Sequence, residues 1–102
     1  MAKVKVAKVS EVEEGALKKV KVGEEDVDLF NVGGQIYATS NICTHEFCEI
    51  DQNYSMHGDT VECTCHGSQF DVKTGKNTLP PAAEDLKTYK VSVEGEEVFV
   101  EE

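Results

Sequence analysis

Two short segments of the chain combine cysteine with histidine, and their side chains could bind a transition metal. The first segment is Cys43-Thr44-His45 and the second is Cys63-Thr64-Cys65-His66, with residues 46–62 between them. Thiolate sulfur and imidazole nitrogen are ligands of zinc and of iron–sulfur clusters. Because two neighbouring loops can bring such segments to one point, the sequence predicts a metal site, with iron as the leading candidate.

The order of the ligands along the chain bears on the choice of metal. Two cysteines and two histidines could hold one tetrahedral zinc ion, or a two-iron cluster with both cysteines on one iron and both histidines on the other. Zinc fingers usually join like ligands, as Cys-x-x-Cys followed by paired histidines. Here each segment mixes cysteine with histidine, which favours two loops that each contribute to both irons. A structural zinc site is the alternative.

The pattern Cys-x-His followed at a distance by Cys-x-x-His resembles the Rieske iron–sulfur family. Residues 43–48 and 63–68 are similar to the two cluster-binding segments of the cytochrome bc-complex Rieske proteins, in which the second cysteine of each segment joins a disulfide. The resemblance implies that one 2Fe-2S cluster is bound by four ligands, Cys43, His45, Cys63 and His66. It also implies a disulfide between Cys48 and Cys65.

Residues after the second segment extend the resemblance. Residues 70–76, 86–89 and 91–100, with Pro80-Pro81, look like the small soluble Rieske ferredoxins that feed bacterial oxygenases. Ser68 follows Gly67 at the place of a serine that, in the bc-complex proteins, donates a hydrogen bond to a cluster sulfur. Phe70 stands where those proteins carry a tyrosine that donates to a cysteine ligand. In the family the proline segment covers the cluster, although a plain connector is the alternative for Pro80 and Pro81.

Alternation of apolar and polar residues predicts an all-β fold. Such alternation occupies residues 4–9, 17–22 and 27–32, and Gly33-Gly34 predicts a two-residue hairpin turn to residues 35–39. A second hairpin is expected from residues 89–93 and 97–100 around 94–96. Together with the resemblance, this predicts a Rieske-type β-sandwich or small barrel over residues 1–102, a single domain.

A cluster-binding subdomain is expected as an insertion at about residues 42–76. Its three or four strands should include residues 60–62 and 69–72, with the two metal-binding segments as projecting loops. The stretch from Ile50 to Gly58 is polar, and we expect it to lie on the surface. His57 falls outside both ligand spacings and is interpreted as an ordinary exposed histidine.

Charge points to the kind of partner. Twenty acidic residues against ten lysines, with no arginine, give a net charge of −10. Such a charge argues against nucleic acid and anionic membrane as partners, and favours a basic docking face on another protein. Glu46, Glu49 and Asp51 lie next to the first metal-binding segment and are candidates for docking, although acidic side chains also serve solubility alone.

The expected location is the cytoplasm, without a membrane anchor. No apolar run approaches the ~20 residues that span a bilayer, and residues 1–6 lack the apolar stretch of a signal peptide. Cytoplasmic cysteines usually stay reduced, so a disulfide here needs a potential below that of the glutathione pool. A chain of this size is expected to act as a monomer.

Outside the metal-binding segments, the sequence contains no catalytic triad, phosphate loop or nucleotide fingerprint. We therefore expect an electron carrier rather than an enzyme. The resemblance implies one-electron transfer from a flavin reductase to a redox partner, most plausibly a terminal oxygenase of a dioxygenase system. Two alternatives are a small Rieske subunit of a larger oxidoreductase, of the nitrite reductase or molybdenum oxidase type, and a zinc-holding structural or binding module.

Overall fold

The computed structural model of the chain describes residues 3–43, 48–65, 67–79 and 84–101. Within these ranges the regular structure is β-strand with two single-turn 3-10 helices, η1 (Val9–Glu11) and η2 (Ile50–Gln52). The strands are β1 (Lys3–Lys8), β2 (Leu17–Val22), β3 (Glu25–Val32), β4 (Gln35–Ser40), β5 (Tyr54–His57), β6 (Thr60–Cys63), β7 (Ser68–Asp71), β8 (Asn77–Leu79), β9 (Thr88–Tyr89), β10 (Val91–Glu94) and β11 (Glu97–Glu101).

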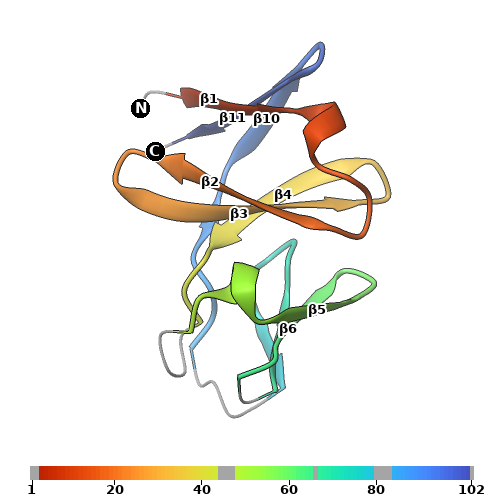
Figure 1. The fold of residues 1–102 in the computed structure, drawn as a ribbon, viewed down its shortest axis with the longest axis vertical. Coiled ribbons are helices and arrows are strands. Elements are labelled where there is room, and N and C mark those ends of the chain that lie inside the picture. The colour runs from red at the N-terminus through yellow and green to blue at the C-terminus, as the bar shows by residue number, and fades with distance from the viewer. Residues whose placement is uncertain (1–2, 44–47, 66, 80–83, 102) are drawn as a thin grey trace.

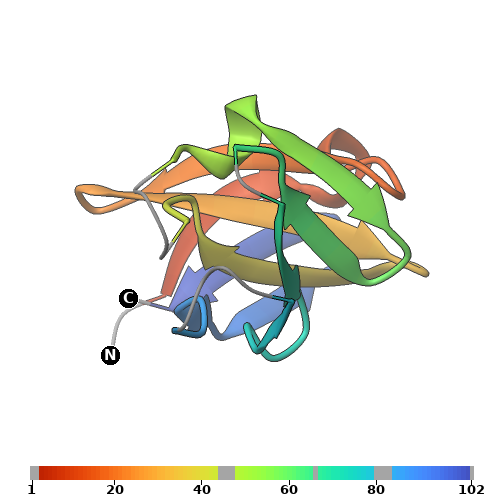
Figure 2. The same cartoon turned by 90° about the horizontal axis from the view of Figure 1, so that it is seen from below.

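The strands form three antiparallel sheets, with the orders β1-β11-β10, β2-β3-β4-β9 and β5-β6-β7-β8. The first two sheets stack at one end of the molecule and are called the base here (Figure 1). The third sheet lies at the other end; together with the described loop residues 41–43, 48–53, 63–65 and 67–68 it is called the cluster-binding subdomain here. Seen from below, its strands cross in front of the second sheet (Figure 2). The predicted all-β fold with an inserted subdomain is confirmed.

Strand β3 lies between two cores. Successive side chains of a strand point to opposite faces, so Val27 and Leu29 face the first sheet while Asp28 and Phe30 face the subdomain. Val27 and Leu29 belong to an aliphatic core between the two base sheets, and Phe30 belongs to the core of the subdomain. All four residues are fully buried. The strand therefore joins the base to the part of the molecule that carries the cysteines.

The predicted hairpin at Gly33-Gly34 is confirmed. Val32 pairs with Gln35 across a two-residue turn, and both glycines have positive φ, at 61° and 90°. Two positive φ values match the right-handed twist of the flanking strands, and only glycine adopts them without strain. The second predicted hairpin is also present, because Glu94 pairs with Glu97.

Two features differ from the sequence predictions. The stretch Ile50–Gly58 is not merely polar surface, since Ile50 is fully buried and residues 54–57 form β5, paired with β6. Tyr54 and Met56 pack on the subdomain core while Ser55 and His57 are polar, so a short alternating strand was missed. The expected strand at 89–93 is divided: Tyr89 pairs with β4 and Val91 pairs with β11, so the chain crosses from one base sheet to the other.

Candidate metal centre

The first metal-binding segment is closed at its base by backbone hydrogen bonds. The Cys43 N–H donates to the Cys48 carbonyl at 2.8 Å, and Ile42 forms an antiparallel bridge with Glu49. The Ile50 N–H donates to the Asn41 carbonyl at 2.7 Å. These contacts fix both ends of the segment, while residues 44–47, with His45 and Glu46 among them, lie outside the described residues.

The second segment connects β6 to β7. Cys63 is the last residue of β6 and pairs with Ser68, the first residue of β7. The Gly67 N–H donates to the Cys63 carbonyl at 2.9 Å, which closes a tight loop. His66 lies outside the described residues. The sequence-predicted ligands that can be placed are therefore Cys43 and Cys63, both at the edge of the subdomain core.

Cys43 and Cys63 are free thiols in contact with each other. They are 2 % and 1 % exposed, and the Cys43 side chain hydrogen-bonds to Cys63. Burial raises the pKa of the Cys63 thiol to about 11, and the neighbouring Cys43 adds to the increase. A thiolate at this place therefore needs a cation beside it, and a metal that binds here displaces the protons.

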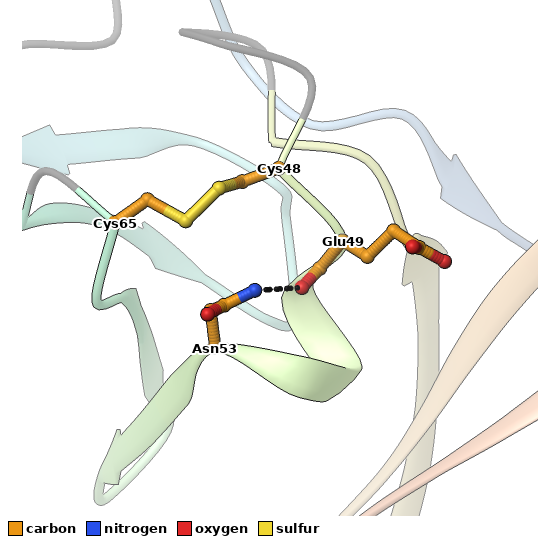
Figure 3. The surroundings of a disulfide bond; sticks show 4 residues. All are labelled: Cys48, Glu49, Asn53 and Cys65. Atoms are coloured by element: carbon orange, nitrogen blue, oxygen red, sulfur yellow. Dashed lines mark hydrogen bonds between the residues drawn. A yellow bond between two sulfur atoms is a disulfide. The ribbon is translucent and has the colours of Figure 1, made fainter.

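The remaining two cysteines are joined. Cys48 and Cys65 form a disulfide with a Cα–Cα distance of 6.7 Å, which links the two metal-binding segments (Figure 3). This is the pairing that the family resemblance implied. The sulfur atoms of Cys48, Cys63 and Cys65 lie within 4.8 Å of one another. Since the disulfide occupies two of these sulfurs, the thiols available as ligands among the described residues are those of Cys43 and Cys63.

Two asparagines that sequence reasoning missed hold the segments in place. The Asn53 side-chain amide donates to the Glu49 backbone carbonyl at 3.1 Å, beside the disulfide in Figure 3. The backbone carbonyl of Asn53 accepts from the Thr64 N–H at 2.9 Å. Asn53 thus ties the first segment to the second. Asn41 is fully buried, and its side-chain oxygen accepts from the Asp51 N–H at 3.0 Å. Asn41 lies two residues before Cys43 and Asn53 five residues after Cys48, and nothing in the sequence distinguishes either from an ordinary turn asparagine.

Ser68 and Phe70, which the resemblance implies to be neighbours of the cluster, can be placed in the structure, and their contact with a cluster stays a prediction. Ser68 is 1 % exposed and stands opposite Cys63, and Phe70 is fully buried in the same core as the two thiols. Pro80 and Pro81 lie outside the described residues. His57 is exposed and outside this core, with its Nε2 atom 2.9 Å from Glu62 Oε1, as an ordinary surface histidine would be.

Gly75 anchors the segment that precedes β9. The Leu86 N–H donates to the Gly75 carbonyl at 2.7 Å, and a Cβ atom on Gly75 would lie 2.2 Å from the Leu86 carbonyl oxygen. Only glycine fits this approach, and its φ of +77° is also one that favours glycine. The Asn77 N–H donates to Asp85 at 2.8 Å. These contacts hold the chain on both sides of Pro80-Pro81 against the subdomain.

Comparison with known proteins identifies the class. The family model of the Rieske [2Fe-2S] domain matches residues 2–90, so the chain belongs to that family. The buried pair of free thiols and the disulfide between the two segments fit the cofactor of the family, one Rieske 2Fe-2S cluster. Among the described residues, no helix is long and apolar enough to cross a membrane.

Particular relatives narrow the class to ferredoxins. The chain is 38 % identical over 101 residues to the biphenyl dioxygenase ferredoxin subunit of Pseudomonas sp. (strain KKS102), covering 99 % of this chain and 93 % of the relative. It is 36 % identical to the ferredoxin component of the naphthalene 1,2-dioxygenase/salicylate 5-hydroxylase systems of Ralstonia sp, covering 95 % and 92 %. Among solved structures, the ferredoxin of carbazole 1,9a-dioxygenase from Nocardioides aromaticivorans IC177 has a TM-score of 0.91 at 30 % identity, with 98 % and 97 % coverage.

Proposed function

We propose that the protein is a one-electron carrier that takes electrons from a flavin reductase and delivers them to a terminal oxygenase. The proposal rests mainly on how much of each relative's length this chain spans. The chain spans 93 % of a dioxygenase ferredoxin subunit, but only 29 % of the terminal oxygenase of carbazole 1,9a-dioxygenase from Novosphingobium sp. KA1. The match is thus to a whole carrier and to one part of an oxygenase chain.

The proposed ligands are Cys43 and Cys63 on one iron and His45 and His66 on the other. When bound, such a cluster accepts one electron at a potential of about −150 to +300 mV, higher than all-cysteine plant-type clusters at about −400 mV. The subdomain core keeps both thiolates away from water, and the Cys48–Cys65 disulfide with Asn53 holds the two segments together. A fixed ligand set limits rearrangement when the electron arrives.

The charge of the chain supports a protein partner with a basic docking face. A net charge of −10 favours fast association with such a face at low salt. One of the sequence-predicted docking candidates needs revision: the Asp51 side chain is 17 % exposed and turned toward the base, whereas Glu49 is 50 % exposed. A structure of reduced oxygenase with oxidised ferredoxin in carbazole 1,9a-dioxygenase contains a similar fold, at 33 % identity and a TM-score of 0.89. The proposal includes a single domain over residues 1–102 and a cytoplasmic location.

Reductive titration tests the carrier directly. The purified protein should be red-brown, and dithionite under argon should reduce it with a single electron per chain while an electron paramagnetic resonance (EPR) signal develops. A colourless protein that contains zinc and takes up no electron would support the structural-module alternative instead. Gel filtration of the protein from its native host tests the alternative of a small Rieske subunit, because such a subunit would elute together with its larger oxidoreductase.

The oxygenase partner is tested by stopped-flow mixing of the reduced protein with the purified terminal oxygenase of a dioxygenase system. Oxidation of the protein should accelerate with oxygenase concentration, and the rate should fall as ionic strength rises, because salt screens the attraction between an acidic carrier and a basic face. A rate that depends on neither oxygenase concentration nor ionic strength would contradict the proposed partner. It would not bear on the carrier function, which the reductive titration tests separately.

A further inference from the structure

A buried carboxyl group lies at the junction between the base and the cluster-binding subdomain. Asp28, in the middle of β3, is fully buried and faces the subdomain, on the same side of the strand as Phe30. Neither of its carboxylate oxygens accepts a hydrogen bond from a described residue. A buried carboxylate without donors is costly, and neither the proposed ligands nor the disulfide accounts for it.

The nearest cation is shared with other acids. Lys19 on β2 stands directly opposite Asp28, but its Nζ atom lies 3.8 Å from Asp51 Oδ2 and 3.9 Å from Glu49 Oε1. On the other side Asp28 faces Thr39 of β4, which has no charge. Asp26, two residues away on β3, pairs with Lys21 at 3.2 Å. Lys19 is thus shared with two other carboxylates, and among the described residues no ion pair to Asp28 is formed.

Asp51 brings a second unpaired oxygen to the junction. Its Oδ1 atom is buried and also lacks a hydrogen-bond partner, and its charge acts on Asp28. Asp51 belongs to η2, which follows Cys48. The Asn41 side-chain oxygen accepts from the Asp51 N–H, and the Asn41 N–H donates to the Asp26 carbonyl of β3 at 3.2 Å, which attaches η2 to the base. Two carboxylates cannot donate to each other unless one of them carries a proton.

The electrostatics favour a proton on Asp28. Burial raises its pKa to about 8, and the neighbouring Asp51 charge acts in the same direction, while Lys19 opposes the change. At neutral pH the carboxyl is then neutral and can donate. Asp51 Oδ2 lies 3.8 Å from Lys19 Nζ, so the buried Oδ1 is the oxygen left to accept a hydrogen bond.

We propose that Asp28 is a positioning residue that works as a protonated carboxyl: it donates a hydrogen bond to Asp51 and so holds η2, and with it the first metal-binding segment, on the base. Loss of this proton places two like charges at the junction, and η2 loosens. The claim that Asp28 holds η2 on the base does not depend on which metal is bound. Only the claim that this attachment positions a cluster ligand segment rests on the proposed function.

Hydrogen exchange across pH tests the proposal on the cluster-loaded protein. In the wild type, protection of the peptide that contains residues 49–53, corrected for intrinsic exchange, should fall as pH rises through about 8. Asp28→Asn keeps an N–H donor without a titrating proton, so its protection should not fall. Asp26→Asn is the matched control on the same strand: its protection should still fall as pH rises, because Asp28 keeps its titrating proton, but at a lower pH, because the Asp26 charge contributes to the raised pKa of Asp28.

Infrared spectroscopy provides a second readout that needs only the wild type. The spectrum at neutral pH should contain a protonated carboxyl band that disappears as pH rises through about 8, is absent in Asp28→Asn and persists in Asp26→Asn. Absence of the band in the wild type at neutral pH overturns the proposal, as does an equal fall in protection in wild type and Asp28→Asn. Both measurements should give the same result if the bound metal proves to be zinc, so they are separate from the carrier test.

Discussion

The two cores of the molecule are stabilised in different ways. The buried side chains of the base core are aliphatic, with Val27, Leu29, Val98 and Val100 fully buried, and its longest strands contain six to eight residues. The subdomain core contains the buried free thiols of Cys43 and Cys63 among aromatic and aliphatic side chains, and its strands have three or four residues. The base can therefore rest on apolar burial, whereas the subdomain depends on cross-links between its loops.

The largest expected effect separates the two regions most clearly. Substituting any proposed ligand, as in Cys63→Ala or His66→Ala, should abolish the visible spectrum and the bound iron, because one of the two irons then loses one of its two protein ligands. Circular dichroism should still report the strands of the base. His57→Ala is the matched control and should keep full iron content. Normal iron in purified His66→Ala would remove His66 from the ligand set.

Removing the disulfide should lower the free energy of unfolding, and by less when the cluster also links the two loops. Chain-entropy models give about 3 kcal/mol for a closed loop of this size, here a separation of 17 residues. The double variant Cys48→Ser/Cys65→Ser should lose close to this value in urea unfolding after iron is removed, and clearly less with the cluster bound, because the cluster ties the same loops. Equal losses in both states would show that the cluster does not cross-link them.

Whether the disulfide forms in solution is checked by mass spectrometry of the denatured, alkylated protein. Modification of two cysteines without reductant and of all four after reduction is expected. Modification of all four without reductant would leave two buried free thiols in place of the bridge.

A cavity in the base core should lower the free energy of unfolding without changing the reduction potential of the cluster. Val98→Ala removes methyl groups from a fully buried position and should cost about 2 kcal/mol of unfolding free energy. Val93→Ala, on the paired strand β10, is the control, since Val93 is 47 % exposed and should change stability little. The reduction potential should be the same in both variants, and a shift in Val98→Ala alone would mean that the two cores are coupled.

The smallest predicted effects lie next to the thiols. Phe70→Tyr should raise the reduction potential and Ser68→Ala should lower it, because a hydroxyl donor stabilises the more negative reduced state. A hydrogen bond to a charged group, of ~1.5–3 kcal/mol, corresponds to shifts of about several tens of millivolts or more for one electron. Voltammetry that finds both variants at the wild-type potential would place these side chains out of reach of the cluster.

Much of the base could be predicted from the sequence because its strands obey a simple rule. Residues 17–22 cover the whole of β2 and residues 27–32 cover most of β3 (Glu25–Val32), and Gly33-Gly34 specifies the turn between 27–32 and 35–39. Strand β5 was missed because it has only four residues, too few for alternation to stand out. The division of residues 88–94 into β9 and β10 could not be predicted, because it depends on which sheet each half joins in the folded structure.

The candidate site divides in the same way. Spacing selected the cysteine and histidine segments, and the family resemblance supplied the pairing of Cys48 with Cys65, which the structure contains. Asn41 and Asn53 could not be selected, because asparagine is common in turns of every kind. Asp28 was hidden for another reason: alternation predicts a strand, but not that both faces of that strand are covered.

The ligand set of the cluster is the central claim, and EPR-based hyperfine spectroscopy of the reduced protein tests it most directly. Reduced protein from cells fed ¹⁵N-labelled histidine should show coupling of the cluster spin to two histidine nitrogens, unchanged in His57→Ala. The signal should vanish in Cys43→Ala and Cys63→Ala, which remove the described thiols. A reduced protein without an EPR signal, or a cluster spin with no coupling to histidine nitrogen, would contradict this ligand set.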